Sequence, residues 1–207
     1  MFDRSLIVAQ ERLLAHPARR LAAAGVSADA ISLAGFLIGL GAVPLLAASA
    51  FLPALACILA NRLFDGLDGA VARLNGPTDR GAFLDIALDF FFYGAVPVGF
   101  ALADPASNAL PAAILLLSFI GTGSSFLAFA AISHKRGQAI APFPGKGIQF
   151  IGGLTEGAET IAFFIAMCLF PEIFPALAYV FASLAALTTA TRWWWGWTHF
   201  GARKPTR

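Results

Sequence analysis

Long apolar runs dominate this chain, and short polar or proline-containing segments interrupt them at intervals. A helix needs about 20 residues to cross the ~30 Å hydrocarbon core of a membrane. The run from 30 to 60 carries no charge and is too long for one such helix, and residues 49–53 supply a break. The pattern therefore predicts six transmembrane helices. We place them at 29–48, 52–74, 81–102, 109–132, 154–170 and 175–195.

The composition agrees with a membrane protein. Hydrophobic residues make up 58% of the chain and charged residues 13%, whereas a soluble domain has about 25% charged residues. We expect an all-α membrane protein. Residues 3–23 have an amphipathic pattern, with Leu6, Leu13, Leu14 and Leu21 opposed to arginines, which predicts an interfacial helix. We expect one domain over 1–207, made of the interfacial helix (1–25), a six-span bundle (29–195) and a basic C-terminal tail (196–207).

The loop cations lie in every second connection between the predicted spans, which places them all on one side of the membrane. They precede the first span, separate spans two and three, separate spans four and five, and follow the last span. These loop cations are Arg4, Arg12, Arg19, Arg20, Arg73, Arg80, Lys135, Arg136, Lys146, Arg203, Lys204 and Arg207. Because cytoplasmic loops carry an excess of Lys and Arg, both termini are predicted to be cytoplasmic, in the inner membrane of a cell.

Four aspartates interrupt otherwise apolar sequence: Asp65, Asp68, Asp85 and Asp89. Each charge at the bilayer centre costs about 2.5–3.5 kcal/mol even on a lenient scale. The first pair shares one face of span two and the second pair shares one face of span three. We expect no cationic partner sufficient to neutralise them, so the pattern predicts a site for hard cations that prefer oxygen ligands, Mg²⁺, Mn²⁺ or Ca²⁺. A proton or ion relay in a transporter is the alternative.

The spacing of these aspartates resembles the signature of the CDP-alcohol phosphotransferases. That signature is D-x-x-D-G-x-x-A-R, a short loop, then G-x-x-x-D-x-x-x-D. It occurs here from Asp65 to Asp89, with a loop of seven residues, and all eight of its fixed positions are present. The resemblance also covers the six-span layout and the N-terminal helix.

The resemblance implies a reaction in which an alcohol attacks the phosphorus distal to cytidine in a CDP-linked substrate and CMP leaves. It implies two divalent cations, Mg²⁺ or Mn²⁺, held by Asp65, Asp68, Asp85 and Asp89, with Asp89 also acting as the general base. It places the nucleotide at Gly69, Ala72, Arg73 and Gly81. Tight helix packing is an alternative explanation for the two glycines. A homodimer is a further expectation from the family, and no nucleic acid partner is expected.

The acceptor alcohol is not specified by the sequence. We consider three groups of residues as its possible pocket, and each has an alternative role. The serines can bond their own helix backbone, the cations can determine topology or bind lipid headgroups, and acids at a helix N-terminus are favourable for dipole reasons alone. The groups are Ser124 and Ser125; Lys135, Arg136 and Lys146; and Glu156 and Glu159.

Three functional hypotheses follow. The first is transfer of a phosphatidyl group from CDP-diacylglycerol to a small hydroxylated acceptor, at a site facing the cytoplasm. The second exchanges the roles of the two substrates, so that a CDP-linked headgroup is donated to diacylglycerol. The third is a cation-coupled transporter, which would not require D-G-x-x-A-R beside the acids.

Overall fold

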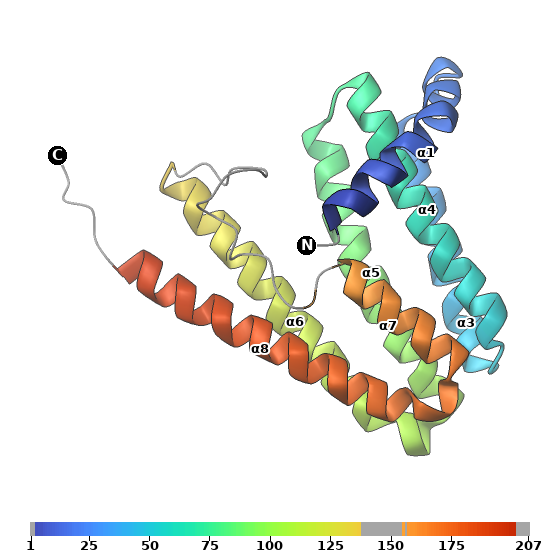
Figure 1. Ribbon diagram of the computed structural model, residues 1–207, viewed down its shortest axis with the longest axis vertical. Helices are drawn as coiled ribbons and strands as arrows, with labels where there is room; N and C mark the ends of the chain where they lie inside the picture. Colours follow the sequence, from blue (N-terminus) through green and yellow to red (C-terminus); the bar gives the residue numbers. More distant parts are fainter. Residues whose placement is uncertain (1–2, 138–154, 156, 202–207) are drawn as a thin grey trace.

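The computed structural model describes residues 3–137, 155 and 157–201, with side chains described from Leu13 onward. Every regular element in these residues is helical, as predicted. Figure 1 shows the arrangement of the helices. They are α1 (Asp3–Ala23), α2 (Ala28–Leu40), α3 (Ala42–Ala47), α4 (Phe51–Asn75), α5 (Asp79–Ala103), α6 (Pro105–Lys135), α7 (Gly157–Leu169), the 3₁₀ helix η1 (Pro171–Ile173) and α8 (Phe174–Gly201).

The observed helices follow the predicted spans, except that α6 begins at Pro105 rather than at 109 and α8 continues past 195. The segment predicted as 29–48 consists of α2 and α3, which meet at Gly41. Of the segment predicted as 154–170, residues 154 and 156 lie outside the described residues. Helix α8 continues to Gly201, so the predicted tail begins too early. The reason is packing, because the rings of Trp195, His199 and Phe200 on α8 contact Phe129 on α6.

Four segments of the described chain are long and apolar enough to cross a membrane: 28–47, 79–103, 105–135 and 171–201. The protein is therefore a multi-pass membrane protein. Helix α4 has the required length, but its second half carries Arg62, Asp65, Asp68 and Arg73. Helix α7 has 13 described residues, fewer than a full crossing needs. The count of six spans and the cytoplasmic termini stay predictions.

The connections segregate to two ends of the molecule. In Figure 1 the α4–α5 turn and the C-terminal end of α6 lie in the upper half and the C-terminal end of α8 at about mid-height, whereas the α3–α4 turn, the α5–α6 turn and η1 lie toward the bottom. The upper group contains the described cations Arg80, Lys135 and Arg136. The structure thus groups these loop cations as the alternating charge pattern requires.

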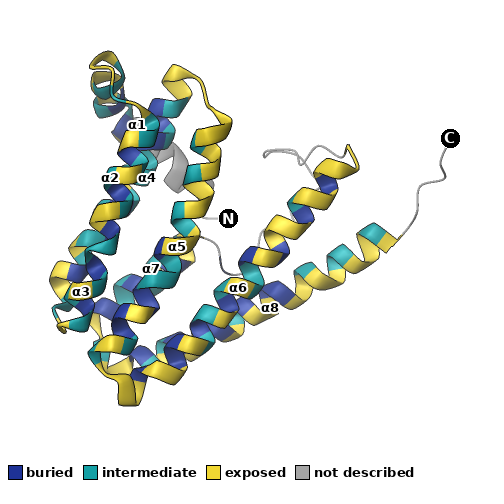
Figure 2. Cartoon of the chain, turned by 180° about the vertical axis from the view of Figure 1, so that it is seen from behind, coloured by how far each residue is buried: buried dark blue, intermediate teal, exposed yellow. Residues whose placement is uncertain are grey.

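The main core is built largely from phenylalanine rings. Phe92 and Phe100 of α5, Phe164 of α7, and Phe174 and Phe181 at the start of α8 are at most 2% exposed. The rings of Phe100 and Phe174 stack with centroids 4.5 Å apart. Figure 2 shows buried positions along the inner faces of the helices and exposed positions over the outer ends of α6 and α8. This core fixes α5, which carries two of the four aspartates.

Helices α2 and α4 approach each other closely. A Cβ atom added to Gly35 would lie 2.5 Å from the Cβ of Phe64, so only glycine fits there without movement. The Asn61 side-chain amide donates to the carbonyl of Gly35 at 3.0 Å. This contact brings α2 beside the part of α4 that carries Asp65 and Asp68.

Helix α1 packs on the same part of α4. Leu14 and Ala18 are buried in a cluster with Ile31, Ala70 and Val71. Leu13, predicted to share the apolar face with Leu14, is 75% exposed and points outward. Because α1 uses small and apolar residues against α4, it is part of the packed structure around the site.

Candidate active site

A tight turn brings the acidic faces of α4 and α5 together. Gly76 ends α4 with φ 90°, a conformation that glycine adopts at little cost. Thr78 caps α5 by accepting a hydrogen bond from the Gly81 amide at 3.0 Å. From this turn α4 and α5 run in opposite directions, and their acidic side chains meet across the gap between them.

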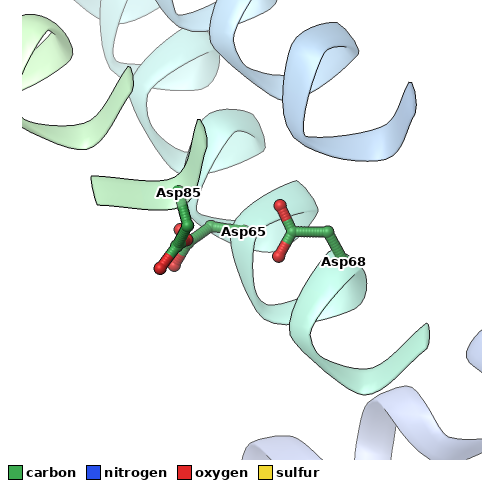
Figure 3. A group of neighbouring side chains, drawn as sticks. All are labelled: Asp65, Asp68 and Asp85. Carbon is green, nitrogen blue, oxygen red and sulfur yellow. The ribbon is translucent and has the colours of Figure 1, made fainter. Parts of the chain in front are cut away.

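Three of the four aspartates meet at one point. Asp65, Asp68 and Asp85 each offer a carboxylate oxygen, and these oxygens lie within 4.8 Å of one another. Figure 3 shows the side chain of Asp68 directed toward those of Asp65 and Asp85. Asp68 is 6% exposed, while Asp85 is exposed, so the cluster is open on one side.

This set of oxygens fits a divalent cation. Mg²⁺ and Ca²⁺ bind carboxylate oxygens at roughly 2.0–2.6 Å, so ligand oxygens on one ion lie within about 5 Å of one another. The three carboxylates satisfy that limit. Asp65, Asp68 and Asp85 are therefore able to hold such an ion, and the chemistry of the donors excludes a preference for soft metals.

Asp89 differs from the other three acids. The Arg62 guanidinium donates to both of its oxygens, with Nη2 2.6 Å from Oδ1 and Nη1 3.3 Å from Oδ2. Arg62 Nη1 also lies 3.6 Å from Asp65 Oδ2. Arg62 is thus a partial cationic partner of the acids, one positive charge against four carboxylates. The available signal was the i, i+3 spacing of Arg62 and Asp65 on one helix, and counting only loop cations overlooks it.

Arg62 is held from several sides. Its Nε and Nη2 donate to the side-chain oxygen Oδ1 of Asn61 at 2.8 and 2.5 Å, and Nη1 donates to the Tyr93 hydroxyl at 3.0 Å. The guanidinium carbon lies 5.0 Å from the ring centre of Phe92 and 5.2 Å from that of Tyr93. Such contacts orient a planar guanidinium as well as neutralise acids.

Helix α2 contributes a residue that the sequence did not point to. The Ser32 hydroxyl donates to Asp68 Oδ2. Ser32 lies 36 residues before Asp68 and belongs to no recognisable motif, so only the packing of α2 on α4 reveals it. The pocket around the acids is thus walled by three helices. It is lined by Ser32, Gly35, Phe36, Asn61, Arg62, Asp65, Asp68, Asp85, Leu88 and Asp89.

The residues predicted at the nucleotide lie beside this pocket, nearer the α4–α5 turn. A Cβ on Gly69 would have the Arg73 guanidinium 3.5 Å away and no other atom within 4 Å outside its own helix backbone, so space is open there. A Cβ on Gly81 would lie 3.3 Å from Asp29 Oδ1. Asp29 in turn pairs with Arg80 at 2.5 Å. The close packing of Gly81 against Asp29 is therefore enough to explain why residue 81 is small, without a bound nucleotide. Ala72 is half-buried and Arg73 is exposed.

The residues predicted for the acceptor are not brought together at the aspartates. The hydroxyls of Ser124 and Ser125 donate to carbonyls of their own helix, at 3.4 and 2.9 Å. Arg136 donates to the Phe200 carbonyl at 2.6 Å and thereby ties the end of α6 to α8. Lys135 and Glu159 are exposed, and Lys146 and Glu156 lie outside the described residues. The acceptor pocket stays a prediction.

The chain is similar in sequence to known proteins. Residues 26–200 match the model of the CDP-alcohol phosphatidyltransferase family. The inner membrane protein YnjF of Escherichia coli is 50% identical over 197 residues, covering 95% of this chain and 96% of that protein. The archaetidylinositol phosphate synthase of Methanothermobacter thermautotrophicus is 30% identical over 176 residues, covering 82% and 83% of the two chains.

A solved structure shares the fold. The phosphatidylinositol phosphate synthase PgsA1 of Mycobacterium tuberculosis with CDP-DAG bound superposes with a TM-score of 0.67 at 22% identity, covering 90% of this chain and 94% of that chain. The same enzyme with manganese and citrate gives a TM-score of 0.65. At this identity the likeness concerns the fold. Together with the family match, it identifies the chain as a member of the CDP-alcohol phosphatidyltransferase family, a membrane transferase that makes phospholipid from a CDP-linked alcohol.

Proposed function

We propose that this protein transfers a phosphatidyl group from CDP-diacylglycerol to the hydroxyl of a small polar acceptor and releases CMP. The observation that carries the proposal is the convergence of Asp65, Asp68, Asp85 and Asp89, from two helices, on one pocket that is open on one side. Two bound divalent cations, Mg²⁺ or Mn²⁺, would neutralise and polarise the pyrophosphate and stabilise the departing CMP.

The protein's own residues supply binding and proton transfer. Asp65, Asp68 and Asp85 hold the cations, with Asp89 as a further ligand. Asp89 accepts the proton of the acceptor hydroxyl as that oxygen bonds to the phosphorus distal to cytidine and the bond from this phosphorus to the CMP oxygen breaks. The open space beside Gly69 and the cation of Arg73 suit the nucleotide.

The choice of substrate draws on the relatives. A protein of the same fold has been crystallised with CDP-DAG, and two similar proteins are named as synthases of inositol phosphate lipids. An inositol phosphate is therefore the first acceptor to test. The name of the E. coli relative supports placement in the inner membrane. The loop cations are the reason to propose that the site opens to the cytoplasm. A homodimer is part of the proposal by family likeness.

The test is CMP release by the purified protein. CDP-diacylglycerol is supplied with Mg²⁺ or Mn²⁺ and one acceptor at a time: inositol phosphate, glycerol 3-phosphate, serine, ethanolamine or choline. We expect CMP to appear with one acceptor at a rate well above that with none. CMP release only from CDP-choline or CDP-ethanolamine with diacylglycerol would establish the reversed arrangement instead. The transporter hypothesis is not carried further, because the family is one of transferases.

A further inference from the structure

Arg62 is a cation inside the pocket that the family signature does not include. Its side chain is 16% exposed, and it lines the same pocket as the acids. It bonds both oxygens of Asp89 and approaches Asp65 at 3.6 Å. The pocket therefore contains four carboxylates and one fixed positive charge.

Because Arg62 already bonds Asp89, it competes with a divalent cation for that carboxylate. A carboxylate that accepts two hydrogen bonds from a guanidinium has fewer lone pairs free to ligate a metal. A guanidinium and a divalent ion on the same carboxylate also repel each other strongly where little water screens them. Asp65, Asp68 and Asp85 already gather into one ligand set without Asp89. Before any ion binds, these three carboxylates are thus arranged to ligate one ion, whereas Asp89 is bonded to Arg62.

We propose that Arg62 is the resident counter-ion of Asp89 and a positioning residue for it. Arg62 holds the Asp89 carboxylate when only the ion at Asp65, Asp68 and Asp85 is present. It releases Asp89 when a second ion binds there. The proposal rests on the proposed function, since it presupposes a two-cation site at these aspartates.

The other contacts of Arg62 explain how it can release Asp89 and stay in the pocket. Asn61 accepts from Nε and Nη2, the Tyr93 hydroxyl lies 3.0 Å from Nη1, and two aromatic rings flank the guanidinium. These partners lie on α4 and α5 and are independent of Asp89. The carboxylate is thereby freed both as a ligand and as a proton acceptor, while the arginine remains hydrogen-bonded.

The experiment measures Mn²⁺ binding to the full-length protein in detergent by electron paramagnetic resonance of free Mn²⁺. The wild type is expected to bind one ion tightly and a second at least about tenfold more weakly. Arg62→Met removes the competing charge, so its second ion should bind about tenfold or more tightly than in the wild type. Arg62→Lys keeps the charge and should keep the weak second step.

The matched control is Arg80→Met. It removes an arginine from another ion pair, with Asp29, and that arginine is not among the residues lining the pocket. Its two binding steps should equal those of the wild type. If Arg62→Met fails to fold, Arg62→Gln serves in its place, because it removes the charge and keeps a polar side chain.

The melting temperature gives a second readout. Without Mn²⁺, Arg62→Met should melt below the wild type because the acids lose their counter-ion, and Mn²⁺ should raise its melting temperature by more than it raises that of the wild type. A second binding step that is unchanged or weaker in folded Arg62→Met would refute the inference and leave the proposed function standing. A wild type that binds no Mn²⁺ would refute both.

Discussion

The Ser32 hydroxyl on α2 donates a hydrogen bond to Oδ2 of Asp68 on α4. Ser32 is also 3.1 Å from the Ala28 carbonyl of its own helix, so its position is fixed by the α2 backbone. Asp68 is the most buried of the three clustered acids. A residue outside the aspartate signature therefore sets the orientation of one carboxylate within it.

Ser32→Ala should weaken cation binding. Groups that orient a metal ligand typically contribute 10–100-fold in metal affinity, and we expect a loss near the lower end because Asp68 keeps its burial. Titration with Mn²⁺ measures the effect. Ser183→Ala is the matched control, because that exposed hydroxyl bonds only its own helix at Tyr179. Equal Mn²⁺ affinity in the wild type and Ser32→Ala would show that the hydrogen bond does not position the ligand.

Removal of divalent cations should abolish CMP release. Arg62 supplies one positive charge against four carboxylates, so the pyrophosphate cannot be held there without further cations. Asp65→Asn and Asp85→Asn should each weaken Mn²⁺ binding, and excess EDTA should stop the wild-type reaction. Asp104→Asn is the control. Asp104 caps the start of α6, at the end of the molecule opposite the α4–α5 turn, and Asn caps a helix equally well. Full activity in EDTA would contradict the metal assignment.

Asp89→Asn separates a base from a ligand. If Asp89 takes the acceptor proton, turnover should fall by about 10²-fold or more, while binding of CDP-diacylglycerol survives. Turnover and substrate affinity are measured separately, by CMP release and by equilibrium binding. Equal losses in both would assign Asp89 a binding role only.

Cysteine labelling tests the sidedness of the protein. Thr78 is unsuitable because its hydroxyl caps α5, whereas Asn75 at the end of α4 and Ser107 at the start of α6 are exposed and lie near opposite ends of the molecule. Each is replaced by cysteine in an active background without Cys57 and Cys168. A membrane-impermeant thiol reagent on intact cells should label Ser107→Cys and spare Asn75→Cys, and inside-out vesicles should show the reverse.

CDP-diacylglycerol adds a further readout. Added to the inside-out vesicles, it should slow the labelling of Asn75→Cys, because the lipid nucleotide would enter beside the α4–α5 turn. Labelling of Asn75→Cys in intact cells would overturn the predicted orientation.

The sequence predicted those features of the protein that depend on residues close together along the chain. The spacing of Asp65, Asp68, Asp85 and Asp89 led to the family, which the family match confirms. The apolar runs led to an all-helical membrane fold, and their ends agree with the observed helices within a few residues except at the start of α6 and the end of α8.

The features that the sequence did not predict depend on contacts between segments that are far apart along the chain. Ser32 reaches the site only because Gly35 lets α2 approach α4. The closeness of Asp29 to Gly81 links α2 to α5 and has no local pattern. Arg62 is the exception, since its spacing from Asp65 was visible. Counting the cations of the loops alone overlooks it.

Gly35 also determines how wide the pocket between α2 and α4 is. Any side chain at this place would press on the Cβ of Phe64 and force α2 and α4 apart, so Ser32 would move away from Asp68. A family member with alanine or serine here must therefore orient its buried acid in some other way. Residue 35, rather than any of the aspartates, therefore sets how closely α2 approaches the buried acid.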